Sequence, residues 1–136
     1  MPPSNASPSR GRVLAVDDSY VMRELVTLSL EAAGYSVEAV ASGDAALVAA
    51  ARENFDAFIL DVDMPGMDGL AVGRALRKDP RTRSSMIAMH TSLDEADVRT
   101  GFDGYNAYLR KPFDARRLGE CVDRMLRDRR ARARDA

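Results

Sequence analysis

The segment from residue 57 to residue 69 constrains the fold more than any other part of this sequence. It begins with the apolar run Ala-Phe-Ile-Leu and continues through Asp61 to a Met-Pro-Gly turn. Residues 57–60 contain no polar side chain, which is typical of a parallel strand covered by helices on both faces. Pro65 and Gly66 continue neither strand nor helix, so a loop opens there. The sequence therefore places the Asp61 carboxylate at the carboxyl end of a buried strand, where open α/β sheets bind ligands.

A short apolar strand followed by an amphipathic helix occurs five times along the chain. The expected strands are 13–16, 35–40, 57–60, 86–90 and 105–109. The expected helices are 20–34, one opening at 42–44, 69–78, one from 92 to about 101–104, and one after 114. Strands that alternate with helices predict a parallel sheet wound on both faces through right-handed crossovers. The fold class is therefore α/β, a doubly wound (βα)5 domain with a five-stranded parallel sheet.

Helix caps and buried helix faces are also predicted by residue type and spacing. The expected N-caps are Ser19, Ser42, Asp68, Asp114 and Ser92, the last in a capping box with Glu95. The first helix has an apolar stripe at helical spacing, made of Val21, Leu25, Leu28 and Ala32. The expected faces of the second and last helices are Ala45, Val48 and Ala49, and Leu118, Val122, Met125 and Leu126.

Length and composition limit the possible functions. The 136 residues suit one domain, which we place at 11–128 between a disordered lead-in at 1–10 and a basic tail at 129–136. A net charge of −1 gives no global attraction to nucleic acid or membrane. Cys121 is the single cysteine, and the chain has no signal peptide or membrane-spanning run, so we expect a cytoplasmic protein. The arginine-rich tail is interpreted mainly as a solvated helix end.

Polar residues follow four of the five expected strands. Asp17 and Asp18 follow the first, Asp61 the third, Thr91 the fourth and Lys111 the fifth. The carboxyl ends of parallel strands share one edge, so these side chains should converge. Clustered carboxylates repel and raise one another's pKa unless a cation lies between them. Oxygen ligands favour Mg²⁺ over zinc, and Mg²⁺ beside a lysine and a hydroxyl forms a receptacle for a phosphoryl group. The single histidine, at position 90, is interpreted as a packed strand residue.

These residues resemble the receiver domain of two-component response regulators, most closely its single-domain chemotaxis-type members. The resemblance covers residues 12 to about 128. It is carried by Asp17-Asp18, the segment from Asp61 through Met64-Pro65-Gly66-Met67-Asp68-Gly69, Thr91-Ser92, and Lys111-Pro112-Phe113. It implies a flavodoxin-like strand order 2-1-3-4-5 and a cis Lys111-Pro112 bond.

The resemblance also implies roles for individual residues. Asp61 would be the phosphoacceptor, and Mg²⁺ would be held by Asp18, Asp61 and the backbone carbonyl of Asp63, with Asp17 acting mainly through water. Lys111 and Thr91 would contact the phosphoryl oxygens. Thr91 would then act as a switch together with Tyr108, the aromatic residue that changes rotamer.

The implied function is a stand-alone receiver, a signalling domain and not an enzyme, since only the basic tail follows the last expected helix. It would accept a phosphoryl group from a sensor histidine kinase or a histidine phosphotransfer domain and then change its protein contacts. We expect a monomer or weak dimer that binds neither membrane nor nucleic acid. The alternative is an Mg²⁺-dependent phosphatase of haloacid-dehalogenase type with Asp61 as nucleophile, since Asp61-Val62-Asp63 after an apolar strand also fits that family. The position of Asp17-Asp18 and the short chain oppose it.

Two features depart from the usual receiver pattern. The interval from Thr91 to Lys111 is short, so the fourth helix should be short as well. Asp63 is acidic at two residues past the acceptor, where a negative charge would alter hydrolysis of an acyl phosphate.

Overall fold

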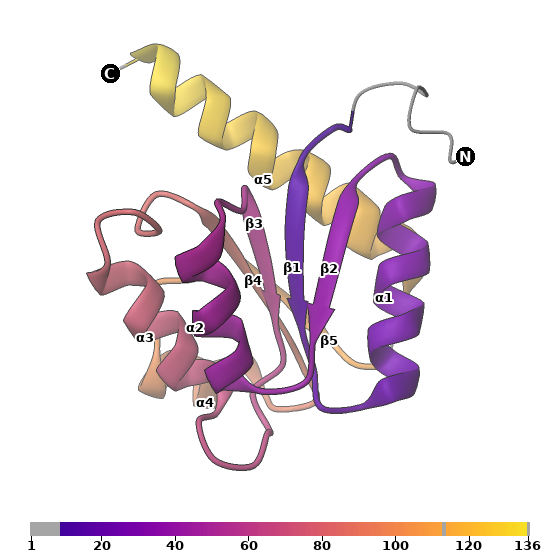
Figure 1. Ribbon diagram of the computed structural model, residues 1–136, viewed down its shortest axis with the longest axis vertical. Coiled ribbons are helices and arrows are strands. Elements are labelled where there is room, and N and C mark those ends of the chain that lie inside the picture. Colours follow the sequence, from indigo (N-terminus) through magenta and orange to yellow (C-terminus); the bar gives the residue numbers. More distant parts are fainter. Residues whose placement is uncertain (1–8, 113, 136) are drawn as a thin grey trace.

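The computed structural model of the chain describes residues 9–112 and 114–135. Five strands and five helices alternate (Figure 1). Their bounds are β1 Arg12–Val16, α1 Tyr20–Ala32, β2 Ser36–Val40, α2 Gly43–Arg52, β3 Ala57–Leu60, α3 Gly69–Lys78, β4 Met86–Thr91, α4 Glu95–Gly101, β5 Ala107–Arg110 and α5 Ala115–Asp135. Residues 1–8 of the expected lead-in and Phe113 of the lysine-proline motif lie outside the described residues.

The strands form one parallel sheet in the order β2-β1-β3-β4-β5, which confirms the predicted fold class and strand order. β5 starts at Ala107, two residues later than expected. The reason is that Asn106 uses both its backbone and its side chain to bond Ile87, which ends the preceding loop. In the register, Val16 lies beside Leu60 and Thr91 beside Arg110, so the carboxyl ends of these strands share one edge.

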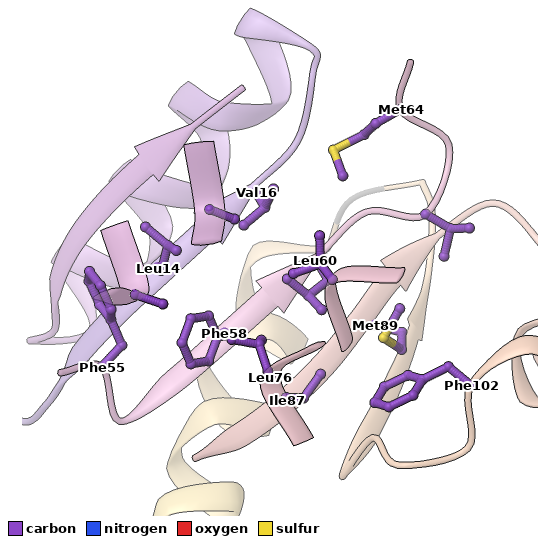
Figure 2. Close-up of a cluster of buried hydrophobic side chains, with 14 of the residues drawn as sticks. Leu14, Val16, Phe55, Phe58, Leu60, Met64, Leu76, Ile87, Met89 and Phe102 are labelled. Carbon is purple, nitrogen blue, oxygen red and sulfur yellow. The ribbon is translucent and has the colours of Figure 1, made fainter. Parts of the chain in front are cut away.

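Side chains that alternate along each strand supply two hydrophobic cores, one on each face of the sheet. On one face, Leu14, Phe58 and Ile87 pack against α2, α3 and α4 (Figure 2). On the other face, Val13, Ile59 and Ala88 pack against α1 and α5. α1 and α5 lie together on one side of the sheet in Figure 1, and α2, α3 and α4 on the other. The central strands are thus buried on both faces, as the apolar run at 57–60 predicted.

The predicted buried stripe of α1 is wrong. Val21, Leu25, Leu28 and Ala32 all face solvent. The helix has a second set of apolar side chains at helical spacing, and that set packs on the sheet; its fully buried members are Val26 and Leu30. Spacing alone does not separate two apolar stripes on one helix, because both repeat every three or four residues.

The predictions of the buried faces of α2 and α5 have different outcomes. In α2, Ala49 of the predicted face is buried, Ala45 is partly buried and Val48 is exposed, while Gly43, Ala46 and Ala50 are also buried. The predicted face is therefore right for Ala49 and wrong for Val48, because small residues rather than the larger valine make up the buried side of the helix. The face predicted for α5 is confirmed, since its four apolar residues are all buried.

Most of the predicted N-caps are confirmed. The side chains of Ser19, Ser42, Asp68 and Asp114 each accept a hydrogen bond from a backbone N–H in the first turn of the helix that follows. The predicted cap at Ser92 is wrong, because α4 begins three residues later with Asp94 at its N-cap position. α4 has only 7 residues, as the short interval predicted.

α5 continues without interruption through the basic segment that follows residue 128. Its carboxyl-terminal half extends past the sheet, at the end away from the carboxyl ends of the strands (Figure 1). Within the described part of the chain, no helix is both long and apolar enough to cross a membrane.

Two leucines of α1 provide a matched test of its orientation. Leu30 is 0% exposed and Leu28 is 61% exposed. Leu30→Ala should lower the free energy of unfolding by about 2 to 5 kcal/mol, because it leaves a cavity in the core. Leu28→Ala should change it by about 0.5 kcal/mol or less. Urea denaturation of the two variants measures both values, and similar losses would contradict this orientation of α1.

Candidate functional site

The acidic pair follows β1 directly. Asp17 is buried and Asp18 is exposed. The Asp17 backbone N–H donates to the Val40 carbonyl at 3.1 Å, which extends the pairing of β1 with β2 by one residue. One Asp17 carboxylate oxygen accepts from the Ser19 N–H at 2.9 Å. These bonds fix the Asp17 side chain at the edge of the sheet and leave the Asp18 carboxylate open to solvent.

Asp61 occupies the equivalent position after β3. Its N–H donates to the Val16 carbonyl at 2.9 Å, and the residue is almost completely buried. The loop that follows folds back so closely that a Cβ on Gly69 would lie 1.9 Å from the Asp61 carbonyl oxygen. Gly66 within that loop has a φ of 75°, which glycine adopts without strain. The two glycines therefore allow the loop to cover Asp61 closely.

Lys111 connects the two buried carboxylates. Its backbone N–H donates to the Thr91 carbonyl at 2.9 Å, so it directly extends β5. Its ammonium nitrogen lies 3.0 Å from an Asp17 oxygen and 3.4 Å from an Asp61 oxygen. The Lys111-Pro112 bond is cis, as expected. The structure thus brings Asp17, Asp18, Asp61 and Lys111 together at one edge, as predicted.

Thr91 and Tyr108 bond to the same residue. Thr91 is fully buried, and its hydroxyl oxygen accepts from the Leu93 N–H at 3.2 Å. The Tyr108 hydroxyl, which is partly buried, donates to the Leu93 carbonyl. Leu93 thus joins the two residues that sequence analysis named as switch candidates. No sequence signal identified it, because it takes part through its backbone.

Burial dominates the electrostatics of the site. Burial first and the Asp17 charge second raise the pKa of Asp61, Lys111 opposes both effects, and the net result is a pKa of about 6. For Lys111, burial lowers the pKa, but the hydrogen bond to Asp17 and the Asp61 charge outweigh it, so the pKa lies above its ordinary value. The raised Asp61 pKa agrees with the prediction that clustered carboxylates repel. A cation beside Asp61 would relieve this unfavourable charge.

Two further side chains lie close to the acidic edge, on the face covered by α1 and α5. Arg23 of α1 donates to the Asp17 carbonyl at 3.0 Å and shares a small internal space with Asp61 and His90. His90 is buried, as expected of a packed strand residue. Burial, aided by the nearby Lys111 charge, lowers its pKa to about 4. No sequence pattern identified Arg23, because its position on the first helix was its only signal.

The acidic cluster fits a small divalent cation. Asp17, Asp18 and Asp61 each offer a carboxylate oxygen, and these three oxygens lie within 4.8 Å of one another. An all-oxygen ligand set with one open, exposed member suits Mg²⁺, which retains several of its waters. Asp63 is exposed.

Comparison with known proteins agrees with this geometry. The family model described as the response regulator receiver domain matches residues 13–123. This chain belongs to the response regulator receiver family.

Individual relatives of the receiver domain support the same assignment. The DNA-binding dual master transcriptional regulator RpaA of Synechocystis is 36% identical over 118 residues, which is 85% of this chain and 49% of RpaA. The chain therefore spans about half the length of that curated relative. The chemotaxis response regulator CheY4 of Vibrio cholerae superposes with a TM-score of 0.79 at 36% identity, over 85% of this chain and 98% of CheY4. The response regulator protein TrrA of Thermotoga maritima, solved in complex with Mg(2+)-BeF, superposes with a TM-score of 0.77 at 31% identity, over 85% and 98% of the two chains.

The raised pKa of Asp61 has a measurable effect on stability. Without a metal, its ionisation opposes folding, so this contribution to stability is complete below about pH 4 and is lost as the pH rises through 6. Asp61→Asn, which carries no charge, should therefore be more stable than wild type at pH 7 by about 1 to 2 kcal/mol.

The measurement is urea denaturation in EDTA at several pH values. The difference between Asp61→Asn and wild type should vanish near pH 4, and added Mg²⁺ should reduce it at pH 7 by stabilising the wild type. Asp103→Asn removes an exposed carboxylate outside the site and serves as the control. A difference that does not depend on pH would contradict the proposed burial of charge.

Proposed function

We propose that this receiver domain accepts a phosphoryl group on Asp61 from a phosphohistidine of a sensor histidine kinase or a histidine phosphotransfer domain, and that the phosphorylated form changes its protein contacts. The observation that carries the proposal is the Lys111 ammonium group, which lies within ion-pair distance of both Asp17 and Asp61 at the carboxyl edge of the sheet. Receiver domains as a family are phosphorylated by histidine kinases or phosphotransfer proteins.

The transfer requires an ionised nucleophile and compensation of charge. An Asp61 oxygen attacks phosphorus as the bond from phosphorus to the histidine nitrogen breaks, and the imidazole leaves. With a pKa of about 6, the Asp61 carboxylate is mostly ionised at pH 7 and needs no general base. The Lys111 ammonium group is placed to pair with a phosphoryl oxygen when one arrives. The chain therefore contributes mainly position and electrostatic stabilisation.

Magnesium is the cofactor that we propose for this site. Asp18 and Asp61 would hold it, with Asp17 acting mainly through water and the Asp63 carbonyl as a further ligand. When bound, the ion neutralises negative charge that the carboxylates and the phosphoryl group bring together. The complex of the related TrrA with Mg(2+)-BeF supports this assignment.

Thr91 is proposed to detect the phosphoryl group. Its hydroxyl oxygen already accepts the Leu93 N–H, which leaves its own proton available for donation to a phosphoryl oxygen. A shift of Thr91 toward that oxygen would displace Leu93 and hence the hydroxyl of Tyr108, which donates to the Leu93 carbonyl. The local charge of about −1.5 to −2 that phosphorylation adds would favour this second arrangement.

We propose that this domain acts as a stand-alone receiver. CheY4 supports this, because it is 36% identical to this chain, as RpaA is, and the alignment covers 98% of its length. Regulators such as RpaA, of which the alignment covers 49%, have further sequence outside the matched region. The family match supports a receiver and gives no support to the phosphatase alternative.

Phosphorylation with acetyl phosphate tests the proposed acceptor. Intact mass spectrometry after incubation with acetyl phosphate and Mg²⁺ should show the addition of one phosphoryl group to wild type and none to Asp61→Asn. EDTA should suppress the labelling, because charge neutralisation would be lost. Asp103→Asn, which removes an exposed carboxylate outside the site, is the matched control and should still be labelled. Labelling of Asp61→Asn, or steady turnover of a small phosphate ester by wild type, would refute the proposal.

The acidic side chain of Asp63 gives a second prediction. Asp63 is exposed and lies two residues from the acceptor, so its charge acts on the water that hydrolyses the acyl phosphate. Asp63→Asn should change the half-life of phospho-Asp61 by about two- to tenfold, equivalent to roughly 0.4 to 1.4 kcal/mol of activation free energy. Loss of label over time measures it, with Asp103→Asn as control. Equal half-lives for Asp63→Asn and wild type would exclude a role for this charge.

A further inference from the structure

A basic pocket lies at the edge of the sheet opposite the acidic site. It has a volume of about 660 Å³ and lies between the start of β4, the loop before β5, the last turn of α3 and the final turns of α5. Its lining includes four arginines, Arg77, Arg83, Arg129 and Arg132. The pocket depends on the extension of α5 past the sheet, which is seen in Figure 1, because Arg129 and Arg132 of this extension line it.

Arg77 forms the fixed part of this basic pocket. Its guanidinium donates to the carbonyls of Gly104, Arg83 and Ser85 and to the side-chain oxygen of Asn106, at 2.6 to 2.9 Å. These four acceptors are neutral, so they hold the Arg77 charge in place without cancelling it. Burial lowers the pKa of Arg77, and the charge of Arg132 lowers it further.

The positive charge in the pocket is largely uncompensated. None of the residues that line it is acidic. Among the described residues, no carboxylate lies within 4.0 Å of the guanidinium of Arg77, Arg83 or Arg132, whereas Arg129 pairs with Asp56 at 3.1 Å. The charges of Arg77 and Arg132 are close enough to repel one another, and an anion beside them would relieve that repulsion. The chain as a whole has a net charge of −1, so this accumulation is local.

We propose that the basic pocket binds a small molecule that bears a phosphate group. Arg83 and Arg132 are exposed residues of the lining, and a guanidinium group has donors in the planar arrangement that matches phosphate oxygens, while Arg77 supplies a fixed positive charge in the same pocket. Tyr105, which is partly buried and also lines the pocket, provides apolar surface for the rest of the ligand. This second site is independent of the proposed phosphorylation of Asp61.

The volume of the basic pocket favours a small ligand over a macromolecule. Its volume lies within the range of about 300 to 1,000 Å³ that is usual for small-molecule sites. A nucleic acid is expected to need a basic stripe along an extended surface. An acidic peptide and a short DNA duplex are therefore competing ligands that the experiment includes.

Isothermal titration calorimetry in EDTA tests the proposal with two probes, inorganic pyrophosphate and adenosine monophosphate. At least one of them should bind saturably at one site, and tighter binding of the nucleotide would show that the organic part contributes. Arg83→Glu and Arg132→Glu should each weaken binding by at least about tenfold, because each loses charged hydrogen bonds. Arg130→Glu makes the same charge change on another side of α5, near Tyr35, and should weaken binding less than about twofold.

Further variants distinguish this site from the phosphoacceptor site. Asp61→Asn should bind the probes as wild type does, and labelling of Asp61 by acetyl phosphate should be normal in Arg83→Glu and Arg132→Glu, which also shows that they fold. The proposal is overturned if neither probe binds, if Arg130→Glu weakens binding as much as Arg132→Glu, or if Asp61→Asn abolishes it. Binding of only a glutamate-rich peptide or a DNA duplex would overturn it as well.

Discussion

The ion pairs of Lys111 with Asp17 and Asp61 are the interaction on which the acidic edge depends. Two carboxylates buried side by side would repel one another strongly without a cation between them. Lys111 follows β5 and must reach past β4 to meet residues that follow β3 and β1. Its long, flexible stem makes that reach possible. The strand order, which places β4 between Lys111 and the two aspartates, therefore determines which residue type can compensate their charge.

The sheet and the acidic edge were predictable from sequence because both follow from strand ends. A strand of apolar residues is recognisable by composition, and the first polar residue after it must lie at the carboxyl edge of a parallel sheet. Asp17 and Asp61 satisfy this rule, whereas Thr91 is the last residue of β4 and Lys111 comes one residue after the polar Arg110 that ends β5. The glycine-rich segment after Asp61 marked a loop. The roles of these residues came from the family resemblance and not from their positions.

Orientation and long-range contacts were beyond the reach of the sequence pattern. α1 has two apolar stripes, and only the packing of α1 on the sheet determines that Leu30 is buried and Leu28 exposed. The N-cap at Ser92 failed because bonds to Leu93 from Thr91 and Tyr108 keep this segment outside α4. The basic pocket joins residues from α3 and α5 that are more than 50 positions apart, and no local spacing rule connects them.

The Leu93 backbone forms hydrogen bonds with both Thr91 and Tyr108, so a single residue connects these two side chains. Rearranging it involves two hydrogen bonds, each of which contributes about 0.5 to 1.5 kcal/mol net. Leu93 and Tyr108 also pack against the hydrophobic core on the face covered by α2, α3 and α4, so their movement adds a local change of packing. In the proposed function, the free energy of these two hydrogen bonds is comparable with what one charged phosphoryl group supplies through its own hydrogen bonds. Such a domain can respond in a graded and reversible way, because the free energy that phosphorylation supplies is similar in size to the free energy needed to rearrange the hydrogen bonds of Leu93.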